Sequence, residues 1–207
     1  MAKIINDPTL GNNIYHISDN LSQYEAARSA FFVFELDKTQ LSNLVRPDID
    51  TASVTPTGDN YFDADEASNY LRLNVVKASV PNFSIEAKEY RRGNDVVKWA
   101  GVPTYAEGSI TVDDVVGLHV KDMLYSWLYL AYDPHTRKGG RMSEYKKTAT
   151  LYEYTQDYKL IRTWTIFGCF ITKIDETEFD IENSDKRQLN VTIVFDRAEM
   201  KPERDAA

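Results

Sequence analysis

The sequence has a single cysteine, Cys169, among its 207 residues, so it cannot form an intramolecular disulfide and has no cysteine spacing of a zinc module. The first residues, MAKIINDPTLGNN, lack the apolar stretch of a signal peptide. No run of apolar residues approaches the length of about 18 that spans a membrane. We therefore expect a soluble protein, made and kept in a reducing cytoplasm.

Basic residues are few relative to acidic ones. The chain holds 24 Lys and Arg against 32 Asp and Glu, which gives a formal net charge of −8 and a pI near 5.0. Proteins that bind nucleic acid gain affinity by releasing counterions from phosphates, and they need a basic surface to do so. The composition therefore argues against a nucleic-acid-binding protein and leaves room only for local basic patches.

Motifs of enzymes and metal sites are also missing. The sequence contains no phosphate-binding loop, no dinucleotide fingerprint, no HExxH and no GxSxG. Its three histidines are scattered, and Cys169 is best interpreted as a small buried hydrophobic residue in a strand. The acidic run 174–185 lacks the turn glycine and tight spacing of a calcium loop. We expect no enzymatic activity, no metal and no cofactor.

The pattern that is present is that of β-strands. Residues 188–196, QLNVTIVFD, place Leu189, Val191, Ile193 and Phe195 on one face, which predicts a half-buried strand. Turn-type residues at 155–158 predict a hairpin between two strands rich in Thr, Tyr and Ile. The remaining strands are predicted at 29–37, 71–80, 83–90, 95–99, 108–115, 147–154, 159–167 and 169–175.

One segment has a helical period. Between Leu118 and Ala131 large apolar residues recur at spacings of three and four, which predicts one amphipathic helix that includes Trp127. The Asp133-Pro134 step ends it, because the residue before a proline disfavours helical geometry. A single helix among eight or nine strands predicts a mainly β protein: an antiparallel β-sandwich or barrel with one flanking α-helix.

The domain organisation follows from composition. Residues 1–28 show little strand periodicity and are interpreted as an extended N-terminal arm. Residues 46–68 collect Pro, Gly and acidic residues without a hydrophobic face, which indicates a long loop inserted into the main domain, 29–197. Residues 198–207 are interpreted as a C-terminal tail. Because long loops in compact domains are often functional, the arm and the loop are candidate partner-binding elements.

Two loops carry opposite charge, and such loops can meet on neighbouring copies of one protein. The alternatives to a contact between copies are that the acidic run is a solvated loop and that the basic loop binds phosphate. The candidate subunit-interface residues are Arg137, Lys138, Arg141, Lys146 and Lys147 in the basic loop 137–147, and Asp175, Glu176, Glu178 and Asp180 in the acidic run.

Several segments in a fixed order resemble a known family. They are VPNF at 80–83, YRRGN at 90–94, KWAG at 98–101, GSITV at 108–112, EYKKTATLYEY at 144–154, WTIFGCFITKID at 164–175 and NVTIVFD at 190–196. In combination they resemble the tail tube proteins of contractile-tailed bacteriophages over roughly residues 29–197. The family is structurally similar to the tube-forming protein of type VI secretion systems.

The resemblance implies a structural virion protein. It implies hexameric rings that stack into a hollow tube inside a contractile sheath, in a tail assembled in the cytoplasm of the host bacterium. The implied partners are further copies of the chain, the sheath, baseplate and tail terminator proteins, and, transiently in the lumen, the tape measure protein and DNA, with no membrane. A negatively charged subunit suits a DNA conduit, because like charge removes the attraction for phosphates.

Three alternatives stay open at this stage. A type VI-like secretion tube would share the fold and carry effector proteins. A terminator or a baseplate-proximal ring would also share the fold without forming the main tube. From a different class, a small-ligand carrier or a hydrolase on a β-barrel would need a closed cavity with converging polar groups.

Overall fold

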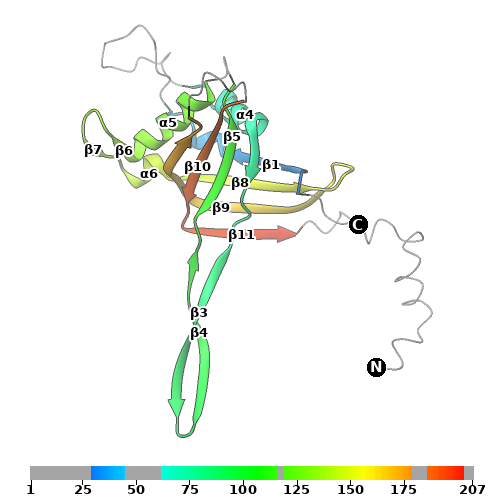
Figure 1. Cartoon of the computed structure of the whole chain (residues 1–207), viewed down its shortest axis with the longest axis vertical. Helices are drawn as coiled ribbons and strands as arrows, with labels where there is room; N and C mark the ends of the chain where they lie inside the picture. Colours follow the sequence, from blue (N-terminus) through cyan, green and yellow to red (C-terminus); the bar gives the residue numbers. More distant parts are fainter. Residues whose placement is uncertain (1–28, 45–61, 116–118, 179–185, 203–207) are drawn as a thin grey trace, which may run out of the picture.

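A computed structural model describes residues 29–44, 62–115, 119–178 and 186–202 of the chain. The described part consists of antiparallel sheets, two longer helices on one side of them, and a long hairpin that projects away from the rest (Figure 1). The predicted N-terminal arm and most of the predicted loop 46–68 lie outside the described residues.

The elements follow one another along the chain with strands predominating. The helices are η2 (Lys38–Gln40), α4 (Ala64–Asn74), α5 (Val120–Ala131) and α6 (Met142–Tyr145). The strands are β1 (Phe32–Leu36), β2 (Val75–Ala78), β3 (Phe83–Arg92), β4 (Asp95–Tyr105), β5 (Gly108–Asp113), β6 (Tyr132–Asp133), β7 (Lys138–Gly139), β8 (Lys147–Tyr154), β9 (Leu160–Glu176), β10 (Gln188–Val194) and β11 (Arg197–Pro202).

Seven strands form the main sheet, in the order β1-β8-β9-β10-β5-β2, with β11 paired to β9. All the pairings are antiparallel. β1 also contacts β2, so the two ends of this path approach each other. The mainly β, antiparallel fold predicted from the sequence is confirmed.

β9 belongs to both halves of this sheet. Its first part pairs with β8 and β11, and its last part pairs with β10. The sequence predicted two strands, 159–167 and 169–175, because Gly168 interrupts the pattern; that prediction is wrong in this respect, since the strand is continuous over 17 residues. Gly168 has φ +65°, and the register with β8 shifts beside it, so the glycine bends the strand without ending it.

The core lies between the inner faces of the strands and the helices. Leu189, Val191 and Ile193 of β10 are buried, as the alternation predicted. α5 buries Val120, Met123, Leu124 and Trp127, which confirms the predicted apolar stripe, and the helix contacts β9, α6 and α4. Within the described part of the chain, no helix is both long and apolar enough to cross a lipid bilayer.

Two elements differ from their prediction. Residues 64–74 form helix α4, where the sequence predicted the end of a loop and the start of a strand; Ala67 and Leu71, one turn apart, are buried in the core. The described chain therefore has a second flanking helix. Residues 197–202 form strand β11 on β9, where the sequence predicted the beginning of a tail.

Candidate assembly surfaces

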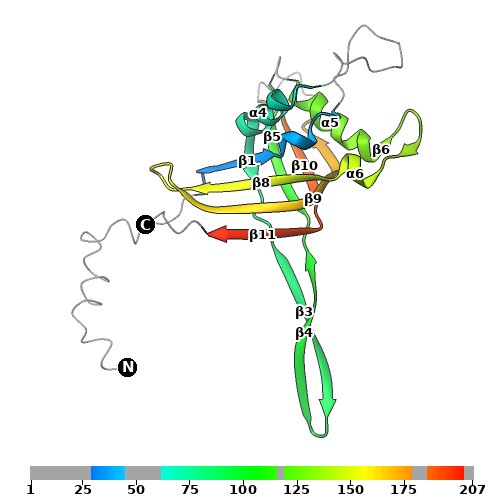
Figure 2. The ribbon, with the colours of Figure 1, turned by 180° about the vertical axis from the view of Figure 1, so that it is seen from behind.

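The hairpin β3–β4 projects from the sheet as a two-stranded ribbon (Figures 1 and 2). Its pairs run from Phe83↔Tyr105 at the base to Arg92↔Asp95 at the tip. Gly93 supplies the positive φ of 68° that the tight turn needs. All ten residues of β3 are exposed, as is nearly all of β4, so within the described part of the chain the ribbon packs on the rest of the subunit only at its base, where Tyr105 contacts Phe195.

The exposed ribbon is rich in large apolar side chains. An isolated two-stranded hairpin is marginally stable in water, and a contiguous exposed apolar surface marks a contact site. Trp99 is 48% exposed and Val102 75%, and the ring of Trp99 lies 6.1 Å from that of Tyr90 between centroids. The exposed apolar residues of the hairpin are Phe83, Ile85, Tyr90, Val96, Val97, Trp99 and Val102. These side chains lie on both faces of the ribbon, since Val96 pairs with Arg91 and Val97 with Tyr90, and they make the ribbon a candidate contact site.

The sequence predicted these strands and missed their role. FSIEAKEY begins with the apolar and polar alternation of a half-buried strand, and the sequence contains no signal that all ten residues of β3 are exposed in the described structure. Only the three-dimensional arrangement shows that these side chains are exposed in the described structure.

Three of the predicted basic interface residues lie on the surface. Arg137 is in the turn between β6 and β7, Lys138 is in β7, and Arg141 precedes α6; all three are exposed. Arg137 has φ 59° in this turn. These residues remain available to a neighbouring molecule.

The other two basic residues are held within the subunit. Lys146 Nζ lies 2.8 Å from both carboxylate oxygens of Asp196. Lys147 is only 2% exposed, and its ammonium group donates to the carbonyl oxygen of Gln40 and to Asn43 Oδ1. The surface position predicted for Lys147 is therefore wrong, because β8 turns this residue inward on the same face as Ala149. Burial lowers the pKa of Lys147 to about 8.

The predicted acidic residues are separated from the basic loop within the subunit. Asp175 pairs with Lys173 at 2.9 Å, Glu178 is exposed, and Asp180 lies outside the described residues. No ion pair joins the described acidic candidates to the described basic ones.

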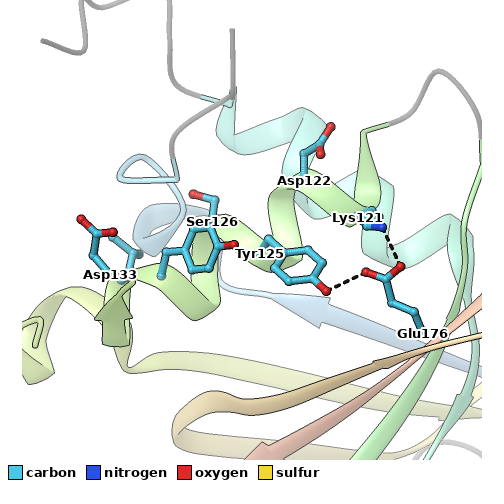
Figure 3. A pocket seen from close by; sticks show the side chains of 8 residues that line it. Lys121, Asp122, Tyr125, Ser126, Asp133 and Glu176 are labelled. Atoms are coloured by element: carbon cyan, nitrogen blue, oxygen red, sulfur yellow. Dashed lines mark hydrogen bonds and ion pairs between the residues drawn. The ribbon is translucent and has the colours of Figure 1, made fainter. Parts of the chain in front are cut away.

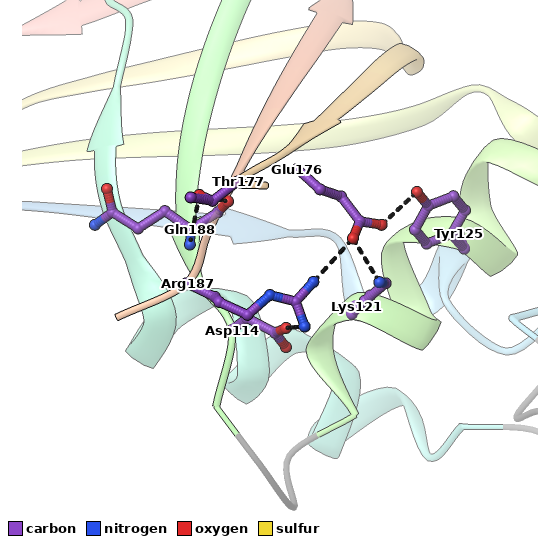
Figure 4. Close-up of polar contacts among 7 residues, drawn as sticks. All are labelled: Asp114, Lys121, Tyr125, Glu176, Thr177, Arg187 and Gln188. Carbon is purple, nitrogen blue, oxygen red and sulfur yellow. Dashed lines mark hydrogen bonds and ion pairs between the residues drawn. The ribbon is translucent and has the colours of Figure 1, made fainter. Parts of the chain in front are cut away.

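Glu176 is the centre of a polar cluster that ties α5 to the sheet (Figure 4). Its carboxylate accepts hydrogen bonds from Lys121 Nζ at 2.6 Å, Tyr125 Oη at 2.6 Å and Arg187 at 2.9 Å. Arg187 also pairs with Asp114 at 3.4 Å. The hydrogen bonds from Lys121 and Tyr125 lower the pKa of Glu176. The hydrogen bond between Tyr125 and Glu176 also raises the pKa of Tyr125 to about 12. The cluster joins β5, β9 and β10 to the start of α5.

An open groove runs along the outer side of α5 (Figure 3). Its volume is about 740 Å³. It is lined by Lys121, Asp122, Tyr125, Ser126, Tyr129, Leu130, Asp133 and Glu176. The sequence does not predict this surface, because the helical period marks only the buried face of α5.

Cys169 is buried, as predicted, and burial raises the pKa of its thiol to about 12, far from the range of a reactive thiolate. Among the residues that the structure describes, no group of three or more His, Cys, Asp or Glu is placed to hold a metal ion.

These features describe a β-structured subunit with a projecting apolar ribbon. The family model described as T4-like virus tail tube protein gp19 matches residues 59–199. The chain belongs to this tail tube family, which confirms the resemblance found in the sequence and its role as a structural tube protein. No curated protein sequence matches the chain.

Solved structures share the fold. The sheath-tube complex of an extracellular contractile injection system, PVC, in its extended state has a chain with a TM-score of 0.60 and 15% identity, covering 90% of this chain and 98% of that one. A chain of the PVC sheath/tube terminator has a TM-score of 0.53 and 18% identity, covering 86% and 97%. A chain of the anti-feeding prophage cap has a TM-score of 0.52 and 17% identity, covering 76% and 97%.

Proposed function

We propose that the chain forms hexameric rings that stack into the inner tube of a contractile bacteriophage tail, the conduit through which the genome enters the host. The observation that carries this proposal is the β3–β4 hairpin, whose large apolar residues are exposed in the described part of the subunit. In a self-assembling tube, a second copy of the same chain is available to cover these residues. The hairpin therefore serves as the main contact between copies.

The proposed partners beyond further copies are the sheath, baseplate and tail terminator proteins, with the tape measure protein and DNA in the lumen. The similar structures come from sheath-tube, terminator and cap assemblies, which supports this set. Contacts within the ring use exposed charges: Arg137, Lys138 and Arg141 on one copy face the exposed acids Asp175 and Glu178 on the next. Such a tube acts without an active site.

The outer face of β5 and β10 suits the wall of a channel. Thr111 Oγ1 donates to Asn190 Oδ1 at 2.8 Å, and Ser109 and Thr192 lie on the same two paired strands. The charges on and beside this face occur in pairs, Lys173 with Asp175 and Lys186 with Asp113, each at 2.9 Å, so the face does not hold phosphates as an unpaired basic lining would. We assign this face to the lumen.

The second candidate is a tube that delivers proteins instead of DNA. It is favoured by the fact that the similar structures belong to contractile injection systems. Genes for a capsid and a DNA-packaging enzyme beside this one favour the phage tail; genes for toxins in a cluster without a capsid favour the injection system.

Electron microscopy of the concentrated protein tests the assembly. Wild-type protein is expected to form hollow tubes, and the double variant Trp99→Ser/Val102→Ser is expected to remain a folded monomer. Leu73→Gln, which changes a residue that is 74% exposed on α4, is the matched control and should still form tubes. A wild-type protein that stays monomeric at high concentration in low and moderate salt would contradict the proposal.

A further inference from the structure

The groove along α5 has an aromatic floor. Tyr125 and Tyr129 lie one helical turn apart, with ring centroids 5.8 Å apart, and Tyr129 is 46% exposed. Leu130 and Ser126 complete the floor. Figure 3 draws Tyr125 on α5 and Asp133 just beyond its end among the side chains that line the groove.

The groove is also acidic. Asp133 accepts hydrogen bonds from the backbone N–H of His135 at 2.8 Å and from Thr136 Oγ1 at 2.6 Å; these bonds lower its pKa and keep it charged. Asp122 Oδ2 lies 3.1 Å from His119 Nδ1. Carboxylate oxygens accept more than one hydrogen bond, so both groups keep capacity for a further donor.

The cation that lines the groove is already neutralised. Lys121 is the basic residue among the lining side chains, and its ammonium group pairs with Glu176 at 2.6 Å. Asp122 and Asp133 therefore leave the lining with a net negative charge, with Lys138 opposite Asp133 in the β6–β7 pair. Tyrosine rings beside carboxylates form the environment that arginine prefers, because a guanidinium group stacks on the rings and donates in pairs to the carboxylates.

Such arginines are present at the tip of the β3–β4 hairpin. Arg91 and Arg92 precede the turn at Gly93, and both are exposed. Within the described residues neither guanidinium group forms an ion pair. Their charges are thus presented to a partner.

The tip and the groove lie toward opposite ends of the long axis of the subunit, with the tip at one extreme and α5 close to the other (Figures 1 and 2). The ribbon is about 33 Å long at about 3.3 Å per residue, and it points away from α5. A subunit cannot place its own tip in its own groove. Two different surfaces at opposite ends are the arrangement that joins copies head to tail into an open assembly.

We propose that the Arg91–Arg92 tip of one copy docks in the α5 groove of a second copy, between the tyrosine rings and the carboxylates of Asp122 and Asp133. The proposal rests on the proposed function, in that copies of the chain stack along one axis. It adds the site at which the tip of the hairpin is received.

Disulfide trapping tests the contact. Asn94→Cys places a thiol at the tip and keeps both arginines, and Ser126→Cys places a thiol in the groove with little change in size. The native thiol of Cys169 is buried and does not interfere. The two variants are mixed, assembled and oxidised, and cross-linked dimers are counted on a non-reducing gel. The matched control replaces Ser126→Cys with Ser29→Cys, an exposed serine before β1.

We expect the tip–groove mixture to give at least about tenfold more dimer than the control mixture. Tubes that form normally while both mixtures cross-link equally would overturn the docking site and leave the proposed function intact. The groove would then receive the sheath or another segment. Failure of the wild type to assemble would overturn the proposed function and the docking site together.

Charge reversal provides a second measurement. Arg91→Glu/Arg92→Glu is expected to raise the protein concentration needed for assembly by about tenfold or more, because buried charge pairs at interfaces are costly to break. Asp122→Arg/Asp133→Arg in the same chain should recover part of the loss. Unchanged assembly of the tip variant would overturn the proposal, as would a quadruple variant that recovers nothing while its monomer remains folded.

Discussion

Gly168 leaves room for the carboxylate of Asp196. A Cβ atom at Gly168 would lie well inside van der Waals contact with Asp196 Oδ2, and the same carboxylate receives Lys146 Nζ at 2.8 Å on both oxygens. The carboxylate of Asp196, just after the end of β10, therefore contacts both the bend of β9 and the residue before β8.

Gly168→Ala is expected to destabilise the subunit by about 2–5 kcal/mol, the sum of a left-handed backbone cost of about 1–2 kcal/mol and an overpacking cost of about 1–3 kcal/mol. Gly93→Ala is the matched control, because its φ of +68° is similar and nothing lies within 4 Å of the added methyl group. It should cost about 1–2 kcal/mol or less. Urea unfolding measures both, and equal losses would contradict the role of Asp196.

Trp127→Ala is expected to destabilise the subunit by about 3–5 kcal/mol, because Trp127 is 1% exposed and its Nε1 donates to the carbonyl oxygen of Tyr145 at 2.8 Å. Trp99→Ala, on the exposed hairpin, should change the free energy of unfolding by less than about 1 kcal/mol and impair assembly instead. A loss under about 1 kcal/mol for Trp127→Ala would show that the helix does not depend on this side chain for its packing.

Lys147 makes stability depend on pH in a defined interval. Its pKa is about 8 in the fold, below its ordinary value of 10.5, so between these pH values the unfolded chain binds more protons at this site. The free energy of unfolding of the wild type should therefore rise from pH 8 to 10.5 relative to Lys147→Met. Parallel stability curves for the two proteins would show that the buried amine carries no such shift.

The pKa of Tyr125 is expected to depend on the carboxylate of Glu176. The hydrogen bond to Glu176 is the largest cause of the raised pKa of Tyr125, about 12, so Glu176→Gln is expected to bring this pKa down toward 10. Carbon-13 NMR of the tyrosine ring, assigned with Tyr125→Phe, follows the titration. Glu178→Gln, two residues further along and exposed, should leave the pKa unchanged. An equal effect of both variants would contradict the assignment.

The strands and the main helix could be predicted because their burial follows a local period. Leu189, Val191 and Ile193 alternate in β10, and Val120 and Trp127 fall on one stripe of α5. Helix α4 could not, because Leu71, Leu73 and Val75 alternate like a strand, yet only Leu71 is fully buried and Leu73 is 74% exposed. Packing against β1 and η2 outweighs the local preference there.

The assembly surfaces were harder to predict for a different reason. The family resemblance gave the tube role, but the apolar face of the hairpin looks the same in sequence whether its own core or a second copy covers it. The prediction that Lys147 is exposed was wrong because it rested on charge alone. The alternation of β8 places this side chain inward, on the same face as Ala149. The groove is lined by one face of α5 and by Glu176, which is about 50 residues further along the chain. No local sequence pattern links these two segments.

The continuity of β9 has a mechanical consequence. A load on a strand that is bonded along its length is resisted by many hydrogen bonds sharing the force in shear, whereas bonds at a strand end break one after another by peeling. β9 is bonded to β8 and β11 over its first part and to β10 over its last, within one covalent chain. In a tube wall built from such subunits, β9 therefore carries part of any force that passes between the two halves of the sheet, together with the contact between β1 and β2.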